Sequence, residues 1–313
     1  MSSERTGQTM VTNPVYGSNF PDPAVLEVDG TYWAYATKNQ VEAMPVLRSS
    51  DLVRWEEVGD GMPQLAAWVE PGLNWAPEVA AVDGRYVAYY TAHDRATDVQ
   101  AVGVAVSDTP DGPFRDDAER PLLCQDHEGG SIDASPFTDH DGSRWLLWKN
   151  DGNHVGVDTF IYVQRLSDDG LRLEGEAQRI LKQDQEWEGT LVEGPYVWPH
   201  AGSYYLFYSG NAFDSDRYGV GYAVAEQATG PYVKPRDTPI MVSNEVAAGP
   251  GHGMVVERDG RTWYVHHAWP PGAVNVPGPG RQMWLTELVF EPSPDGGPDV
   301  PRFLGPRTDL DLA

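Results

Sequence analysis

Short apolar segments alternate with polar turns along the whole chain. The apolar segments are rich in Val, Tyr and Trp, and the turns between them are rich in Gly, Asp and Pro. Such runs, bounded by turn residues, are typical of strands, and no segment combines sustained helical spacing with helix caps. The pattern therefore predicts an all-β fold built from many short strands.

A unit of this pattern recurs five times, and each copy opens with a short motif that contains proline. The five motifs are Pro21-Asp22-Pro23, Trp75-Ala76-Pro77-Glu78, Asp133-Ala134-Ser135-Pro136, Glu193-Gly194-Pro195 and Gly249-Pro250-Gly251-His252. We align the copies on the prolines at positions 23, 77, 136, 195 and 250.

Each motif precedes an apolar strand, a tight turn and an aromatic strand. The turns are Asp-Gly at 29–30, 83–84, 141–142 and 259–260, and Ala-Gly at 201–202. Asp-Gly is a strong hairpin signal because both residues tolerate positive φ. A third strand follows in most units, as in 101–107 and 220–225. Three or four strands per unit at this period are typical of β-propeller blades.

Five such units predict one closed ring, because a single blade cannot bury its two faces alone. We therefore expect a five-bladed β-propeller that forms a single domain over residues 1–313. We also expect the stretch around 10–15 to supply a strand that closes the last blade.

Composition narrows the function classes. The net charge of −25 repels phosphate backbones and anionic lipids, so neither nucleic acid nor a membrane is an expected partner. Cys124 is the only cysteine, which excludes an intrachain disulfide. The first residues lack an apolar signal-peptide core, which favours a cytoplasmic location, although a secreted protein trimmed of its leader would look the same. The oligomeric state is left open.

Acidic side chains stand in three of the five motifs: Asp22, Asp133 and Glu193. The first strand of a blade lines the central channel, so these side chains are expected to converge at one end of the axis. Clustered carboxylates repel one another and lose solvation, so a purely structural role explains them poorly. Carboxyl groups in different environments can supply the acid and the base that glycoside hydrolysis requires.

The ordered motifs resemble those of glycoside hydrolase family 43 over essentially the whole chain. The matching segments are 19–23, 75–78, 132–137, 193–195 and 249–253. The resemblance implies a five-bladed propeller of inverting enzymes that act mostly on α-L-arabinofuranosides and β-D-xylosides. It also implies that Asp22 is the general base, Glu193 the general acid, and Asp133 the group that raises the acid's pKa and orients it. Base and acid carboxyls should then lie roughly 6.5–9.5 Å apart.

Further positions match the family. His252 corresponds to a histidine that lies on the channel axis near an ion or a water molecule. We therefore consider a structural Ca²⁺ near His252, with a histidine that only packs in the core as the alternative. No cofactor is expected to be required for the chemistry. Arg281 matches an arginine that lies across the sugar pocket, with a blade-edge role as the alternative. Aromatic rings beside the motifs are candidate sugar platforms or else blade packing. These are Phe20, Trp75, Trp187, Phe213 and Trp269.

The favoured hypothesis is an exo-acting α-L-arabinofuranosidase that releases arabinose from arabinose- or xylose-containing oligosaccharides. A β-D-xylosidase, or an enzyme with both activities, is the first alternative. A retaining fructosidase fits less well, because Asp133 is followed by Ala-Ser-Pro and Glu193 by Gly-Pro. A non-catalytic sugar-binding propeller is the remotest reading, because all three acids are present.

Overall fold

The computed structural model describes residues 11–310, and its strands form five antiparallel sheets and one two-stranded ribbon. Blade 1 contains β2 (Ala24–Val28), β3 (Thr31–Tyr35), β4 (Pro45–Ser49) and β5 (Glu56–Asp60). Blade 2 contains β6 (Val69–Val82), β7 (Arg85–Asp94) and β8 (Val99–Ser107). Blade 3 contains β9 (Ser131–Thr138), β10 (Arg144–Asn150), β11 (Phe160–Leu166) and β12 (Leu173–Lys182).

The remaining elements complete the ring. Blade 4 contains β13 (Val192–His200), β14 (Ser203–Gly210) and β15 (Gly219–Ala225). Blade 5 contains β16 (Ala248–Arg258), β17 (Arg261–Trp269), β18 (Gln282–Glu291) and β19 (Val300–Phe303). The helical elements of residues 11–310 are η1 (Asp126–Glu128), α1 (Gly152–Val155) and η2 (Glu186–Glu188). Within this range no helix has the length and apolar character needed to cross a membrane.

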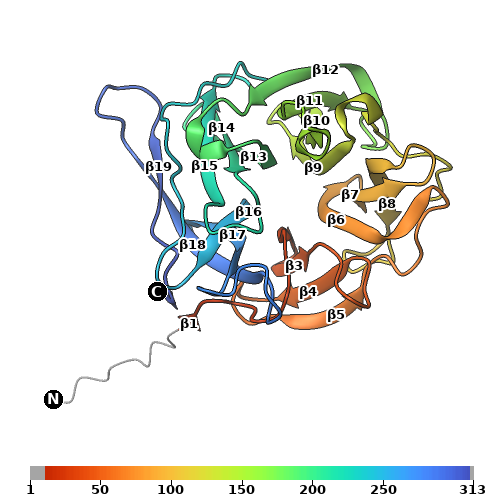
Figure 1. Cartoon of the computed structure of the whole chain (residues 1–313), viewed down its shortest axis with the longest axis horizontal. Helices are drawn as coiled ribbons and strands as arrows, with labels where there is room; N and C mark the ends of the chain where they lie inside the picture. Colours follow the sequence, from red (N-terminus) through yellow and green to blue (C-terminus); the bar gives the residue numbers. More distant parts are fainter. Residues whose placement is uncertain (1–10, 311–313) are drawn as a thin grey trace.

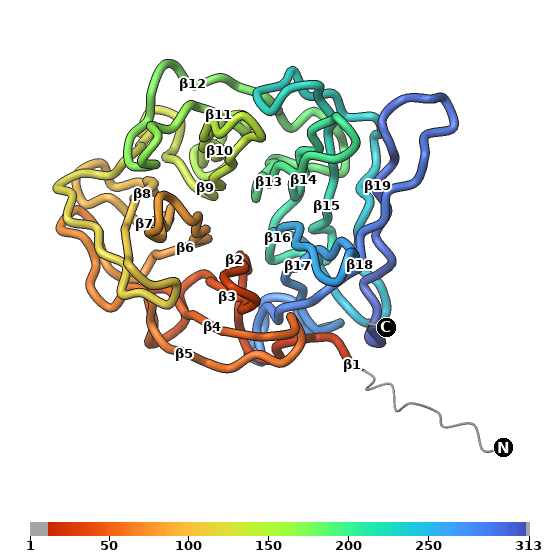
Figure 2. Tube along the Cα trace, turned by 180° about the vertical axis from the view of Figure 1, so that it is seen from behind, coloured from red at the N-terminus to blue at the C-terminus, as the bar shows by residue number. Residues whose placement is uncertain are grey.

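The five sheets follow one another around a central axis in chain order, which confirms the predicted five-bladed propeller (Figure 1). Seen from behind, the first strand of each blade lies innermost and the later strands lie progressively outward (Figure 2). The prediction of a single domain over 1–313 extends at both ends beyond the described residues and stays a prediction.

The hydrophobic core is divided into clusters that lie between neighbouring blades. One cluster joins blades 1 and 5 through Val25, Trp263 and Leu285, and another joins blades 2 and 3 through Tyr89 and Trp148. Equivalent clusters join blades 1 and 2, blades 3 and 4, and blades 4 and 5. Each blade therefore buries its faces only against its neighbours, as the repeat pattern predicts.

Each inner strand contains, or is preceded by, an irregularity at its channel end. In blade 3, Ile132 pairs with Lys149 and Ser135 pairs with Leu147, so two residues face Trp148 alone. The same two-against-one pairing interrupts the inner strands of blades 2, 4 and 5. The first residue of every bulge has positive φ. The inner strand of blade 1 has no bulge, but the residue before Pro23, which precedes β2, also has positive φ. These residues are Asp22, Ala76, Asp133, Gly194 and His252. A bulge re-aims the side chains beside it, here at the channel.

The bulges correct the alignment of the repeats on prolines. Pro23, Pro77 and Pro195 directly follow the positive-φ residue of this set, but Pro136 stands three residues after Asp133, and Pro250, two residues before His252, follows a different positive-φ residue, Gly249. What the blades share is a backbone conformation rather than a residue type. Asp and His tolerate positive φ better than most residues, so the conformation does not require glycine.

The three acids therefore do not occupy equivalent positions in their blades. Asp22 and Asp133 both occupy the positive-φ position, whereas Glu193 stands one residue before Gly194. Side chains on successive positions of a strand point in different directions, so the one-residue offset separates the direction of Glu193 from that of the two aspartates.

The N-terminal stretch contacts the last blade, but the predicted strand does not join the sheet of that blade. β1 (Val11–Thr12) pairs with β20 (Asp309–Leu310), and Tyr16 bridges Met283 of β18. Between these contacts the buried Asn13 side chain donates to the carbonyls of Leu285 and Arg307 and accepts the Leu285 N–H. Residues 11–16 are thereby fastened to both the last blade and residues 307–310.

We expect Asn13→Ala to lower the free energy of unfolding by about 2–4 kcal/mol, because it leaves buried backbone groups of blade 5 unpaired. Urea unfolding followed by tryptophan fluorescence measures this loss. Asn39→Ala is the matched control, because Asn39 also makes three side-chain hydrogen bonds, but only to residues 41 and 42 of its own loop. Equal losses in the two variants would contradict the role of Asn13 in fastening residues 11–16 to blade 5.

Candidate active site

The positive-φ residues are held by hydrogen bonds that run from blade to blade. In four of the five blades the backbone N–H of this residue donates to a buried side chain on the second strand, or just beyond it, of the preceding blade. The pairs are Ala76 N to Thr37 Oγ1 (2.8 Å), Asp133 N to Thr91 Oγ1 (3.1 Å), His252 N to Ser209 Oγ (2.8 Å) and Asp22 N to His267 Nδ1 (3.2 Å). The exception is Gly194, whose N–H donates to Asp133 Oδ2 at 3.0 Å.

Asp22 is surrounded by groups that stabilise its charge. Its side chain is buried, with Arg281 Nη1 2.6 Å from Oδ1 and the Thr37 hydroxyl donating to Oδ2 at 2.6 Å. Burial alone would raise the pKa of Asp22, but Arg281, His252 and His267 together lower it well below its usual value. Asp22 is thus an ionised carboxylate at neutral pH, which is the state that a general base requires.

Glu193 is held at both carboxyl oxygens. The Tyr218 hydroxyl donates to Oε1 at 2.7 Å, and Lys149 Nζ lies 3.3 Å from Oε2. The side chain of Lys149 is completely buried, and Glu193 is only 8% exposed. Two donors from different blades therefore fix the plane of this carboxyl group within the site.

Asp133 interacts electrostatically with both of the other acids. Burial raises the pKa of Asp133 to about 6, and the negative charge of Glu193 adds to this effect while His252 and Lys149 oppose it. Its Oδ2 binds the Gly194 N–H, directly beside Glu193. Asp133 is therefore placed to orient the backbone that carries Glu193.

His252 occupies the centre of the acidic group. Its Nδ1 lies 3.4 Å from Asp22 Oδ1 and 4.0 Å from Asp133 Oδ2. Its ring lies so close to Gly194 that a Cβ there would approach the ring to 3.0 Å. Burial lowers the pKa of His252, but the surrounding carboxylates outweigh it and raise the pKa above the usual value. A protonated His252 would balance part of the negative charge.

The surroundings of His252 do not fit a metal held directly by protein side chains. Among residues 11–310 no group of three or more His, Cys, Asp or Glu side chains is arranged to bind a metal ion. The imidazole faces carboxylates and takes up a proton readily, which would compete with a cation at this place. The water-held Ca²⁺ stays a prediction, and no step of the chemistry below depends on it.

Arg281 and Phe213 form one wall beside the base. The guanidinium of Arg281 lies 4.6 Å from the centre of the Phe213 ring, and Phe213 is 44% exposed. Trp269 is buried, and its Nε1 donates to the Phe213 carbonyl at 2.9 Å. Trp269 therefore supports the loop that presents Phe213, instead of offering its own ring to a sugar.

Two other predicted sugar platforms, Phe20 and Trp187, pack against neighbouring side chains of the blades. Phe20 is 1% exposed and belongs to the core between blades 1 and 5, so its ring has no face free for a sugar. Trp187 packs on Tyr208 of blade 4, with its Nε1 bonded to Gln185. Trp75 is partly exposed at the channel end of β6, opposite Thr91, and stays a candidate platform.

Glu188, a fourth acid near the motif of blade 4, has a structural role. Its side chain is fully buried and binds the Tyr208 hydroxyl and Lys234 Nζ. It also accepts the backbone N–H groups of Asp184 and Gln185. These bonds use both carboxyl oxygens, so Glu188 fixes the η2 turn of blade 4.

Sequence reasoning missed the residues that support the acids. Lys149 and His267 lie near the ends of the aromatic second strands of their blades, and Thr37 lies two residues beyond β3. A polar residue directly after a buried aromatic run was the available signal, because such positions are unfavourable in a core without a partner. Tyr218, which follows the loop of Phe213, carried no comparable signal.

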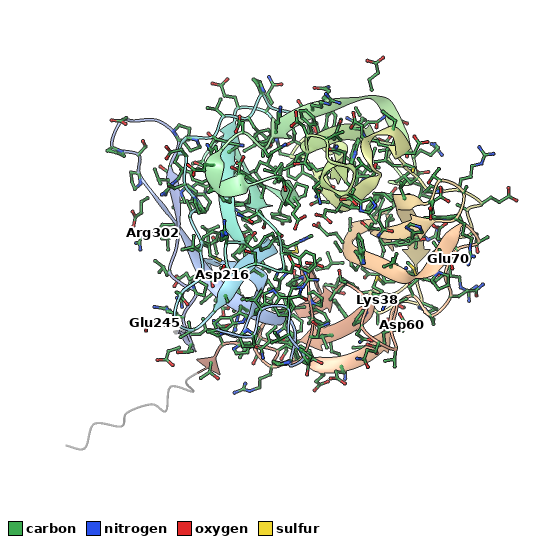
Figure 3. All side chains as sticks on the ribbon, viewed as in Figure 1. Lys38, Asp60, Glu70, Asp216, Glu245 and Arg302 are labelled. Carbon is green, nitrogen blue, oxygen red and sulfur yellow. The ribbon has the colours of Figure 1, made fainter. Side chains whose placement is uncertain are left out.

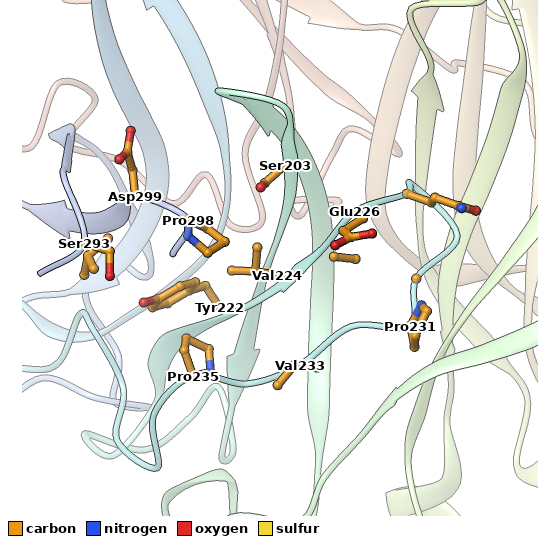
Figure 4. A pocket seen from close by; sticks show the side chains of 14 residues that line it. Ser203, Tyr222, Val224, Glu226, Pro231, Val233, Pro235, Ser293, Pro298 and Asp299 are labelled. Atoms are coloured by element: carbon orange, nitrogen blue, oxygen red, sulfur yellow. The ribbon is translucent and has the colours of Figure 1, made fainter. Parts of the chain in front are cut away.

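An apolar pocket of about 520 Å³ lies away from this group, between blade 4 and the loop that joins β18 to β19 (Figure 4). It is lined mainly by Tyr222, Val224, Pro235 and Pro298. None of the predicted site residues lines it. The chemistry is therefore assigned to the axial carboxyl groups.

The site thus combines three carboxyl groups on the axis of a five-bladed propeller. One is ionised, the second is held at both oxygens, and the third lies beside the second. This arrangement is typical of glycoside hydrolases that use carboxyl groups as acid and base. The sequence profile described as Glycosyl hydrolases family 43 matches residues 11–298. The chain belongs to this family, whose members are inverting hydrolases of O-glycosyl bonds.

Known relatives agree with this assignment. The chain is 27% identical to a β-D-galactofuranosidase of Aspergillus niger, over 83% of this chain and 76% of that one. It is 23% identical to an extracellular endo-α-(1→5)-L-arabinanase of Bacillus subtilis (80% and 65%) and 30% identical to a xylosidase/arabinosidase of Humicola insolens (64% and 67%). The crystal structure of a thermostable family-43 glycoside hydrolase superposes with a TM-score of 0.85 at 32% identity, covering 97% of this chain and 98% of that one.

We expect Arg281→Met to shift the acidic limb of the pH–activity profile to higher pH by roughly 1–3 units, because the pKa of Asp22 rises when the guanidinium is removed. The base is then protonated, and inactive, over more of the acidic range. The measurement is kcat/KM against pH.

The control for this variant is Arg302→Met on the outer strand β19, where Arg302 pairs with the half-exposed Glu291 (Figure 3). Its profile should match that of the wild type. An unchanged acidic limb in Arg281→Met would show that another group sets the protonation of the base.

Proposed function

We propose that this protein is an inverting, exo-acting α-L-arabinofuranosidase that releases arabinose from arabinose- or xylose-containing oligosaccharides. The observation that carries the proposal is that the axial carboxyl groups differ in their charged partners and in their positions on the inner strands. Asp22 is held as an anion by Arg281, whereas Glu193 stands one position apart, beside Asp133.

The three acids then act in a single displacement. Asp22 takes a proton from a water molecule as the water oxygen attacks the anomeric carbon. The bond from this carbon to the leaving oxygen breaks at the same time, and Glu193 gives its proton to that oxygen. Asp133 holds Glu193 in place and favours its protonated form before the reaction. The released sugar has the opposite anomeric configuration to the substrate.

The furanoside preference rests on the relatives and on stereochemistry. An arabinanase and a galactofuranosidase stand among the relatives, and their names specify five-membered sugar rings or arabinose chains. α-L-Arabinofuranose and β-D-galactofuranose carry their ring substituents in the same orientations, so one pocket can admit both rings. The β-D-xylosidase alternative is supported by the relative named for both xylosidase and arabinosidase action.

Burial supports the exo mode. Asp22, Asp133 and Glu193 are each only 7–8% exposed, which suits a terminal sugar that enters end-on better than a chain that lies across the site. Phe213, exposed and stacked on Arg281, offers a ring face beside the terminal sugar. The cytoplasmic location and the independence from a cofactor stay predictions.

A panel of p-nitrophenyl glycosides tests the substrate. We expect the highest kcat/KM with α-L-arabinofuranoside, a lower value with β-D-galactofuranoside, and the lowest with β-D-xylopyranoside. Arabino-oligosaccharides should lose single arabinose units from one end, and NMR of the first product should show the inverted anomer. Internal cleavage of arabinan would contradict the exo assignment, and a retained anomer would favour the fructosidase-type alternative.

Variants of the acids test the catalytic assignment. Asp22→Asn and Glu193→Gln should each lower kcat by about 100- to 10,000-fold without loss of folding, because each removes one proton-transfer group. Glu188→Gln is the matched control: Glu188 is buried in the same blade as Glu193 but bonded away from the axis, so any loss should follow stability. Wild-type turnover in Glu193→Gln would contradict the assignment of Glu193 as the acid, whereas no turnover in any protein, wild type included, would favour the non-catalytic sugar-binding propeller.

A further inference from the structure

The blade-to-blade hydrogen bonds contain one systematic substitution. In blades 2, 4 and 5, the side chain that accepts an N–H from the next blade has a partner residue across the ladder in its own blade. That partner is the residue directly before the positive-φ residue. Thr91 faces Trp75, Ser209 faces Glu193 and His267 faces Gly251. In blade 3 this place, opposite Ile132, is occupied by Lys149.

Lys149 cannot do what its counterparts do. An ammonium group has three donors and no acceptor, so it cannot accept the backbone N–H of Gly194 in blade 4. That N–H donates instead to Asp133 Oδ2, and the lysine donates elsewhere. The substitution of one residue type thus redirects two sets of bonds at the boundary between blades 3 and 4.

The bonds of Lys149 lead directly to the proposed acid. Its Nζ lies 2.7 Å from Asn153 Oδ1, 3.3 Å from Glu193 Oε2 and 3.9 Å from Asp151 Oδ1. The side chain is fully buried, and a buried ammonium is strongly unfavourable unless oxygens surround it. Asn153, in the α1 turn, and Asp151 hold the lysine, and the lysine holds Glu193.

We propose that Lys149 is the positioning residue that fits Glu193, and no other axial acid, for proton donation to the leaving group. This proposal rests on the proposed function of Glu193. Lys149 fixes Oε2 while Tyr218 fixes Oε1, so the acid meets the leaving oxygen in one orientation.

The charge of Lys149 acts in the same direction. Glu193 becomes a carboxylate as its proton passes to the leaving oxygen, and a fixed ammonium at 3.3 Å stabilises that developing negative charge. Asp133, bonded to the Gly194 N–H, supplies the opposing negative charge before the reaction. The redirected bonds of blade 3 thus provide both influences on the acid at once.

Two substitutions separate this role from a structural one. Lys149→Thr supplies the hydroxyl acceptor that blade 2 has at this place, so the Gly194 N–H regains a partner of the kind found in the other blades. Lys149→Met keeps the length of the side chain and removes the charge. Lys182→Met is the control. Lys182 is the last residue of the outer strand β12 and forms an ion pair with Asp158, which lies before β11; both side chains are half-exposed.

The measurement compares two leaving groups on the sugar that the panel identifies as best. A dinitrophenolate leaves without a proton, whereas an alcohol or a second sugar requires the acid. We expect Lys149→Thr to lower kcat about 10- to 100-fold for the poor leaving group and less than about threefold for dinitrophenolate, with KM nearly unchanged. Thermal unfolding should show a folded protein.

The outcomes are distinguishable. Equal losses for both leaving groups in a folded Lys149→Thr, or no loss at all, would overturn the positioning role. Where both lysine variants fail to fold, Asn153→Ala decides: it removes the closest partner of Lys149 from an exposed turn and should produce a smaller, equally selective loss. Glu193→Gln must show the same selectivity; if it does not, the proposed function itself fails, independently of Lys149.

Discussion

The structure depends on how buried backbone N–H groups at the propeller axis find partners. The residue that turns each inner strand toward the channel has positive φ, and its N–H has no partner within its own sheet. A buried N–H without a partner is costly, so each one requires an acceptor from the neighbouring blade. These bonds join blade to blade around the axis and at the same time aim the side chains of Asp22, Asp133 and His252 at one another.

The chemistry follows from unequal surroundings rather than from the acids themselves. Asp22 meets a guanidinium and a hydroxyl and stays ionised, whereas Asp133 is buried with weaker compensation and holds a proton more readily. His252 stands between them and reduces the repulsion that three buried carboxyl groups would otherwise cause. A near-symmetric ring therefore becomes asymmetric through a few side chains, and inverting hydrolysis requires this asymmetry because its two acids have opposite tasks.

Alignment on prolines located the correct segments but not the correct register. It succeeded where proline directly follows the positive-φ residue, as at Pro77 and Pro195, and failed at Pro136 and Pro250. Proline fixes its own φ and does not by itself report the left-handed conformation before it. The aromatic residues show a similar limit: Phe20 and Phe213 look alike beside their motifs, yet one is core and the other is exposed.

The sequence by itself determined the number of blades and the hairpins within them, and it located the three candidate acids, because strand patterns, Asp-Gly turns and motifs are local. The tertiary structure alone decided which side chain reaches which acid. Lys149 and Glu193 belong to different blades, and their distance depends on how those blades pack. The Arg281 guanidinium, which separates the behaviour of Asp22 from that of the equally buried Asp133, likewise reaches Asp22 from another blade.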